Sequence, residues 1–286
     1  MKHFFKHFSF YLVPILILAN LFVWQSVLSQ ENRPLFVSFF DIGQGDSEFI
    51  EAPNGNQVLI DGGPTNAILS KLGEVMPLGD RSIDLIILSH PHADHLLGLV
   101  EVLNRYDVGA VLESGVDYDT SEYKEWNRLL KEKDIPVIIA ITGEKVYLSD
   151  DVYFDIFSPR KNFVDQKLAN VHDSMVVAQL HFGSSTIMFS GDMETSLERE
   201  LVLAGDNLKS DILKIGHHGS KTSTSEEFLK AVNPQFAVIS VGAGNTYGHP
   251  TKEILGRLTL FGIKIFRTDL DGDVFLQSDG TTWVRK

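Results

Sequence analysis

Ser89-His-Pro-His-Ala-Asp-His95 is the stretch that decides the fold of this chain. It places three imidazoles and one carboxylate in six consecutive positions, directly after the apolar run Ile83–Leu88. Histidine and carboxylate side chains suit zinc, iron and manganese, and alternate residues of an extended segment point the same way. The first two histidines are therefore expected to converge on one cation, while Asp94 and His95 face a second. An exposed loop with incidental histidines would explain one such residue, but not this spacing.

The segments on either side of this stretch have the patterns of sheets covered by helices. Short apolar, β-rich runs that end at turns predict strands over 35–40, 57–60, 83–88, 175–182, 186–189, 211–215, 236–241 and 264–266. Helical spacing, or a capped acidic start, predicts helices over 96–106, 121–132, 195–203 and 225–232. Two sheets sandwiched between outer helices would use all of these elements, so the expected class is α/β.

The first thirty residues differ from the rest of the chain. Lys2 and Lys6 precede the apolar run Phe8–Trp24. The run is near the lower limit of the ~17 to 25 residues that span a bilayer, and it is long for the ~7 to 15 residues of a signal-peptide core. Residues 1–30 are therefore expected to be a signal peptide, cleaved after Ser29, or an N-terminal membrane anchor. Either alternative places the remainder outside the cytoplasm, secreted or anchored to the membrane.

The remainder has the composition of one globular domain. The 286 residues are 43% hydrophobic, and no linker or internal repeat divides them, so we expect a single domain over 34–286. The absence of cysteine excludes a thiolate metal site and a cysteine nucleophile. The net charge of -13 opposes loose binding to polyanions, so a nucleic acid would have to be held by local contacts.

Five further motifs accompany the histidine-rich stretch. They are Asp41-Ile-Gly-Gln-Gly-Asp46, Ile60-Asp-Gly-Gly63, Phe189-Ser-Gly-Asp192, Lys214-Ile-Gly-His-His-Gly-Ser-Lys-Thr-Ser223 and Asn245-Thr-Tyr-Gly-His-Pro250. Together the motifs resemble the metallo-β-lactamase superfamily and, within it, the hydrolase domain of the ComEC/Rec2 competence proteins, from about residue 35 to the end. The resemblance implies a four-layer αββα sandwich with a dinuclear site at its edge, holding two divalent ions, zinc or manganese.

In that family the domain is commonly the C-terminal part of a many-helix DNA-uptake channel. This sequence has one apolar segment instead of many, so it resembles a stand-alone relative. We therefore do not assign its substrate from the task of the channel.

The resemblance also implies a set of metal ligands, namely His90, His92, Asp94, His95, Asp192 and His249. Asp192 would bridge the two ions, although taken alone it is better explained as a cap of the helix at 195. His249 is preferred over His217 as the last ligand of the second ion, and the choice stays open. His172 lies where the superfamily often supplies another histidine, but competence-type relatives generally carry other polar residues there, so a plain loop residue is an equal alternative.

Catalytic and substrate-binding roles are expected beside these ligands. Asp94 is expected to orient a metal-bound water, and one of His217 and His218 to bind metal, contact phosphate or shuttle a proton to the leaving group. Ser220, Lys221 and Thr222 offer hydroxyls, backbone N–H groups and one positive charge to non-bridging oxygens.

Two aspartates are expected to support the site without binding metal. Asp61, followed by two glycines, would orient the histidine loop through hydrogen bonds. Asp46 would shape the pocket or receive hydrogen bonds from substrate.

Three functional hypotheses follow. The first is a metal-dependent phosphodiesterase or nuclease that acts on DNA or a related phosphodiester. The second is a hydrolase of lactone, lactam or thioester substrates, for which the Ser/Lys/Thr segment would be idle. The third is a non-catalytic, membrane-tethered binding module, and the intact set of candidate ligands argues against it.

Overall fold

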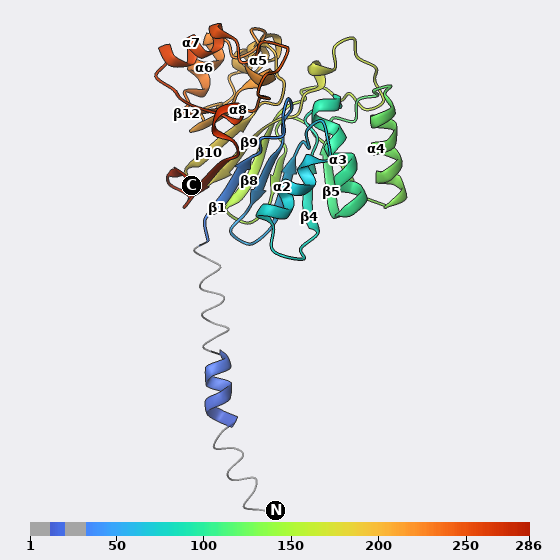
Figure 1. Cartoon of the computed structure of the whole chain (residues 1–286), viewed down its shortest axis with the longest axis vertical. Helices are drawn as coiled ribbons and strands as arrows, with labels where there is room; N and C mark the ends of the chain where they lie inside the picture. The colour runs from blue at the N-terminus through green and yellow to red at the C-terminus, as the bar shows by residue number, and fades with distance from the viewer. Residues whose placement is uncertain (1–11, 21–32) are drawn as a thin grey trace, which may run out of the picture.

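The computed structural model describes residues 12–20 and 33–286 (Figure 1). Residues 12–20 are helical and their side chains are exposed. Within the described residues, no helix combines the length and the apolar character needed to cross a membrane. The predicted cleavage site after Ser29, and most of the predicted signal or anchor segment, lie outside the described residues.

The first sheet is built from eight strands of the described chain. They are β1 (Leu35–Phe39), β2 (Glu48–Glu51), β3 (Gln57–Ile60), β4 (Ser82–Ile87), β5 (Asp107–Glu113), β6 (Val137–Ile139), β14 (Val274–Ser278) and β15 (Trp283–Arg285). Their order across the sheet is β15-β14-β1-β2-β3-β4-β5-β6. Strands β3 to β6 are parallel and the other pairs are antiparallel. β14, near the end of the chain, pairs with the first strand, β1.

The second sheet has seven strands in the part of the chain that is described. They are β7 (Lys145–Tyr147), β8 (Val152–Ser158), β9 (Val177–Phe182), β10 (Ser185–Phe189), β11 (Ile212–Lys214), β12 (Phe236–Ile239) and β13 (Lys264–Arg267). Their order is β13-β12-β11-β10-β9-β8-β7. Strands β10 to β13 are parallel, and β7 to β10 pair antiparallel.

Helices cover the outer faces of both sheets. α2 (Ala67–Val75), α3 (Ala93–Arg105) and α4 (Ser121–Glu132) pack on the first sheet, and α5 (Thr195–Ala204), α6 (Glu226–Val232) and α7 (Lys252–Leu260) pack on the second. Figure 1 shows these two groups of helices on opposite sides of the strands. The short α8 (Thr268–Asp271) and two 3-10 turns, η1 (Val171–Ser174) and η2 (Gly216–Gly219), lie in connections.

Three apolar layers hold the four structural layers together. The central layer lies between the sheets, where the inward residues of β1 meet those of β8 to β10 and the ring of Phe39 stacks on that of Phe189 at 6.0 Å. The alternation of buried residues in β8 follows from the two-residue period of a strand. The predicted αββα sandwich is confirmed.

The histidine-rich stretch straddles the junction between β4 and α3. The helix begins at Ala93 rather than at the predicted residue 96, with His92 as its N-cap residue. His92 therefore lies on extended backbone, as predicted, whereas Asp94 and His95 lie in the first helical turn. A carboxylate in that turn is favoured by the helix dipole.

Candidate metal centre

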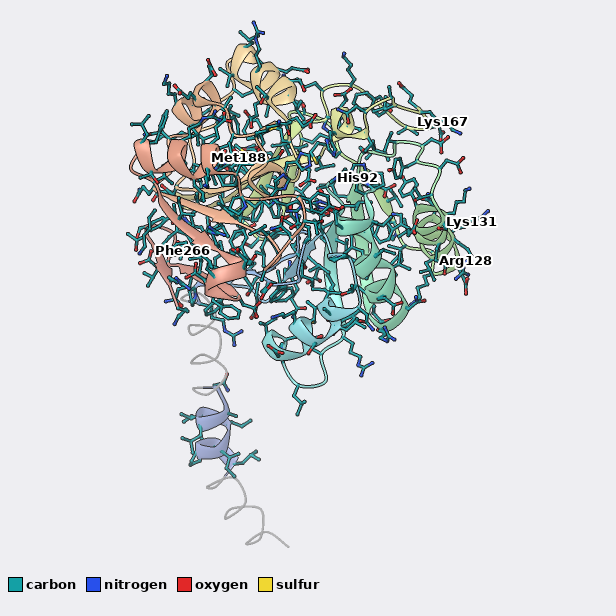
Figure 2. All side chains as sticks on the ribbon, turned by 45° about the horizontal axis from the view of Figure 1, so that its top comes forward. His92, Arg128, Lys131, Lys167, Met188 and Phe266 are labelled. Atoms are coloured by element: carbon teal, nitrogen blue, oxygen red, sulfur yellow. The ribbon has the colours of Figure 1, made fainter. Side chains whose placement is uncertain are left out.

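The candidate site lies where the carboxyl ends of strands from both sheets meet. Asp61 follows β3, the histidine-rich stretch follows β4, and Asp192 follows β10. Two further segments enter from the second sheet, η1 before β9 and η2 after β11. In Figure 2, His92 lies between the two groups of helices. Loops at this edge of an α/β sheet commonly carry the functional groups.

Three histidines form a first ligand group. One nitrogen each from His90, His92 and His172 lies within 4.8 Å of the others. The Nε2 atom of His172 is 3.3 Å from Nδ1 of His92, although 80 residues separate them in the chain. The structure thus places His172 with the ligands rather than in an independent loop.

Two carboxylates and two histidines form a second ligand group, which consists of Asp94, His95, Asp192 and His218. Nε2 of His218 lies 3.4 Å from Asp94 Oδ2 and 3.5 Å from Asp192 Oδ1. Nε2 of His95 lies 3.4 Å from Asp192 Oδ2. A tetrahedral ion with bonds of about 2.0–2.1 Å holds its ligands roughly 3.4 Å apart, which matches these separations.

Asp192 lies between the two groups. Its Oδ2 atom is 3.9 Å from Nε2 of His90 in the first group, and its two oxygens face His95 and His218 in the second. The carboxylate thus lies between the two groups, and its role as a bridge between two ions stays a prediction.

The hydrogen bonds of the histidines leave lone pairs directed at the candidate centre. Nδ1 of His218 is 2.9 Å from the carbonyl oxygen of Ser240, which can only accept, so this nitrogen carries the hydrogen. Nδ1 of His95 similarly lies 2.7 Å from Asp61 Oδ2. Nε2 of His90 and His95 and Oδ1 of Asp192 are buried without a hydrogen-bond partner. Buried polar atoms are rarely left unpaired, so these residues fit a cation at this place.

Asp61 supports the loop that carries the first two histidines. It accepts hydrogen bonds from Ser89 N at 2.8 Å and from the Ser89 hydroxyl, in addition to His95. The Asp61 backbone has a φ of 52°, an uncommon value for a residue with a side chain. The orienting contacts expected of this aspartate are present.

The turn that presents His218 has unusual backbone geometry. His217 and His218 have φ values of 50° and 53°, in the left-handed region that residues other than glycine seldom occupy. Backbone strain of this kind is concentrated at functional sites. The turn brings His218 to the ligand group and leaves His217 beside it.

The charges around the centre favour a cation. Burial opposes protonation of His218, yet Asp192 and Asp46 raise its pKa to about 10. Burial likewise opposes protonation of His95, yet Asp192, Asp61 and Asp94 raise its pKa well above the usual value. The carboxylates thus attract positive charge to positions next to the buried nitrogens.

A pocket of about 200 Å³ opens onto both ligand groups. It is lined by Gln44, His92, Asp94, His172, Asp192, His217, His218, Tyr247 and His249. His217 and His249 therefore face the pocket. His217 joins neither of these two groups but lies with His172 and Glu194 in a third cluster of possible ligands, whereas His249 belongs to no such cluster among the described residues. It is His218 that lies beside Asp94 and Asp192, because η2 turns its ring toward them; which histidine completes the second ion's ligands stays a prediction.

The expected substrate-binding segment lies beside the pocket and does not line it. Thr222 Oγ1 is 3.3 Å from Nδ1 of His217 and 3.0 Å from Ser220 Oγ. Lys221 is exposed. The Thr222 hydroxyl thus contacts His217, and the charge expected from Lys221 is not among the groups that line the pocket.

Sequence reasoning missed several residues at the site, among them Gln44 and Tyr247 of the pocket wall and two charged residues. Glu194, the N-cap residue of α5, has Oε1 3.8 Å from Nδ1 of His172 and 3.7 Å from Nδ1 of His217. Lys214, at the end of β11, is fully buried and contacts Asp46. Lys214 lies in one of the quoted motifs, but nothing in the sequence indicated that its side chain points inward.

Comparison with known families agrees with this geometry. The model of the metallo-beta-lactamase superfamily matches residues 41–243. The chain belongs to this superfamily. The fold and the His/Asp clusters are accordingly those of a divalent-metal hydrolase.

Curated relatives within the superfamily include competence proteins. ComE operon protein 3 of Bacillus subtilis is 32% identical over 86% of this chain and 33% of its own length. Competence protein ComA of Neisseria gonorrhoeae is 31% identical over 90% of this chain and 34% of its own length. This chain therefore spans about a third of the length of these relatives.

Solved structures share the fold at low identity. The metallo-beta-lactamase fold protein YhfI from Bacillus subtilis superimposes with a TM-score of 0.56 at 14% identity, over 82% of this chain and 97% of that one. At this identity the likeness concerns the fold alone.

Proposed function

We propose that the protein is a metal-dependent phosphodiesterase that acts on DNA or a related phosphodiester. The observation that carries the proposal is the arrangement of His217, which lies in the pocket beside both ligand groups and is backed by Thr222 and Glu194. Similarity to competence proteins supports a nucleic-acid substrate. The expected zinc or manganese would be held by His90, His92 and His172 on one side and by Asp94, His95 and His218 on the other, with Asp192 between them.

In this proposal the metal ions, when bound, supply a water of lowered pKa and stabilise negative charge on the reacting phosphate. Asp94 would help to hold the ions and to orient the water. Although burial opposes its ionisation, His95 and His218 lower the Asp94 pKa to about 2, so it is ionised near neutral pH. It also lines the pocket.

His217 has the position of a hydrogen-bond donor to the phosphate or the leaving oxygen. Burial lowers the pKa of His217, so the ring is neutral near pH 7 and carries a single hydrogen. When the Thr222 hydroxyl donates to Nδ1, that hydrogen is on Nε2, which lies 3.9 Å from Asp192 Oδ2. A donor at this point meets the negative charge that develops as the P–O bond breaks.

The test is hydrolysis by the purified full chain, stripped with chelator and reloaded with manganese or zinc. Substrates are single-stranded DNA, duplex DNA, bis(4-nitrophenyl) phosphate, a lactone and a thioester. We expect metal-dependent cleavage of phosphodiesters that His92→Ala abolishes. His181→Ala is the matched control, because His181 lies on β9 against Asp155 and outside the ligand groups.

Three outcomes would contradict the proposal. Full diester cleavage by His92→Ala would show that the activity arises elsewhere. Hydrolysis of the lactone or thioester alone would move the assignment to those substrates. If no substrate is turned over under either metal, the non-catalytic binding module becomes the better hypothesis.

We also propose an extracytoplasmic location, secreted or anchored to the membrane. Support comes from the sequence of residues 1–30, in which Lys2 and Lys6 precede the apolar run. A periplasmic-active phosphatase fused after Lys286 should be active in cells that carry the full chain. An inactive fusion, beside an active cytoplasmic reporter at the same position, would refute this location.

A further inference from the structure

A fully buried lysine lies beneath the candidate metal centre. Lys214 is 1% exposed, and its ammonium group donates to Asp46 Oδ2 and, at 3.1 Å, to the carbonyl oxygen of Gly191. Asp46 is also 1% exposed and lies in the connection between β1 and β2. Burying a charge is costly unless it is paired, so this contact between the two sheets is a specific feature of the fold.

Each partner of Lys214 leads to a candidate ligand. Gly191 directly precedes Asp192, the carboxylate between the two ligand groups. Asp46 Oδ1 lies 3.3 Å from Nδ1 of His218, on the ring edge opposite the one that faces the centre. Asp46 Oδ2 lies 3.8 Å from Nδ1 of His95. The Lys214 ammonium group thus contacts two groups, Asp46 and the Gly191 carbonyl. These two lie next to three candidate ligands from three different segments, namely Asp192, His218 and His95.

Hydrogen bonds that do not involve the ion can still determine where ligands stand. The His218 ring is fixed by Ser240 at one side of Nδ1 and faces Asp46 at the other. The Asp192 turn is held by the Gly191 carbonyl, and the Ser190 hydroxyl also donates to the backbone oxygen of Lys214 at 2.6 Å. Outer partners of metal ligands typically affect metal affinity by about 10–100-fold.

We propose that Lys214, through its ion pair with Asp46, is a positioning residue that sets the Asp192 turn and the His95 and His218 rings at the spacing a cation requires. This inference rests on the proposed function only in that the centre binds metal. It gives Lys214 and Asp46, the last residue of the Asp41–Asp46 motif, a role in positioning the candidate ligands. Neither residue takes part directly in the proposed hydrolysis.

The experiment measures Zn²⁺ and Mn²⁺ affinity of the chelator-treated full chain by calorimetric titration, together with its thermal unfolding midpoint without metal. Lys214→Met and Asp46→Asn each remove one partner of the buried ion pair, and both are expected to lower the midpoint. The double variant removes both charges at similar volume and is expected to recover most of the midpoint. Its metal affinity is expected to remain about 10–100-fold below that of the wild type.

A second ion pair serves as the matched control. Arg160 and Asp206 are partly buried, and neither belongs to a ligand group in the described chain. The double variant Arg160→Met/Asp206→Asn should bind both metals as the wild type does. A loss of affinity equal to that of the Lys214/Asp46 double variant would show that removal of any ion pair weakens the site, and would overturn the proposal.

Wild-type metal affinity in the Lys214→Met/Asp46→Asn variant would also overturn it, because the pair would then be structural only. If these variants do not fold, ¹⁵N NMR of the wild-type Lys214 ammonium group decides. A resonance that shifts on Zn²⁺ addition supports the proposal, and one that does not respond refutes it. Wild-type protein that binds metal but cleaves no phosphodiester refutes the proposed function and leaves this inference standing.

Discussion

His172 and His249, both candidate ligands from the sequence, lie in different surroundings at the site. His172 lies with His90 and His92, whereas His249 lies at the pocket wall with its ring 5.9 Å from that of His217. We expect His172→Ala to weaken binding of one metal equivalent by more than the roughly 10–100-fold caused by losing an outer partner. The matched variant His249→Ala should retain both equivalents. Metal content after dialysis against buffered zinc measures this, and equal losses in the two variants would contradict the ligand assignment.

Glu113 is a buried carboxyl group whose effect depends on pH. It accepts a hydrogen bond from Trp126 Nε1 at 2.8 Å, and burial raises its pKa above the usual value. Because the native state holds this proton more tightly than the unfolded chain does, the free energy of unfolding falls as pH rises from the unfolded pKa to the raised native one. The fall is roughly 1.4 kcal/mol per pH unit in that window.

Replacement of Glu113 should remove this dependence. Glu113→Gln keeps an oxygen acceptor for Trp126 but does not ionise, so the variant should gain stability relative to the wild type as pH rises. Urea unfolding of both proteins at several values between about pH 5 and pH 8 measures the difference. A difference that stays constant with pH would show that Glu113 ionises normally in the folded protein.

At the scale of elements, the packing of α3 against the turn after β3 positions half of the site. Gly98 N donates to Gly63 O at 2.9 Å, and a Cβ at Gly98 would lie 1.8 Å from Gly62 O. Gly98→Ala must therefore displace α3, which carries Asp94 and His95, and should lower stability by about 1–3 kcal/mol or more and weaken metal binding. Gly73→Ala in α2 meets nothing within 4 Å and should raise stability by about 0.5–1 kcal/mol. Chemical denaturation of both variants checks this, and equal effects would contradict the close approach.

The elements that could be predicted are those with a strong local signal. Strands β1, β3, β4 and β10 and helix α4 have continuous apolar runs or clear amphipathic spacing, and the structure contains them. α2 was missed because its N-cap residue makes no side-chain capping bond and its ends carry no complementary charges. β6 and β7 have three residues each, too few to establish a period. β8 was also missed, although its alternation of buried and half-buried residues is regular.

The site residues also fall into those with a strong local sequence signal and those without one. The histidine-rich stretch and Asp192 are recognisable because their ligands are close in sequence or follow a clear strand. The choice among His172, His217, His218 and His249 depends on how turns fold over long separations, for example the 124 residues between His218 and Asp94. Local patterns do not determine such contacts. Glycine is the usual sequence signal of a left-handed turn, and His217 and His218 adopt that conformation without it.

At the scale of the whole molecule, the charge distribution opposes a polyanionic substrate. The net charge is -13, and none of the groups that line the described pocket is a lysine or arginine. Cationic side chains such as Arg128, Lys131 and Lys167 lie away from His92, on the flank formed by α4 and the loop before η1 (Figure 2). Attraction to phosphate must then come from the metal centre itself. Its electrostatic attraction acts over a shorter distance than the field of the whole protein.

This distribution predicts an unusual salt dependence. Repulsion between the protein and a long single-stranded oligonucleotide is screened by salt, so kcat/KM for the oligonucleotide should rise between about 0.01 M and 0.15 M ionic strength. The monoanionic bis(4-nitrophenyl) phosphate, cleaved at the same centre, should change little and serves as the matched control. A protein that neutralises many phosphates with basic side chains behaves in the opposite way, since counterion release makes its affinity fall steeply with salt. A steep fall for the oligonucleotide alone would therefore place a basic binding surface outside the pocket, and would direct the search to the flank that carries Arg128 and Lys131.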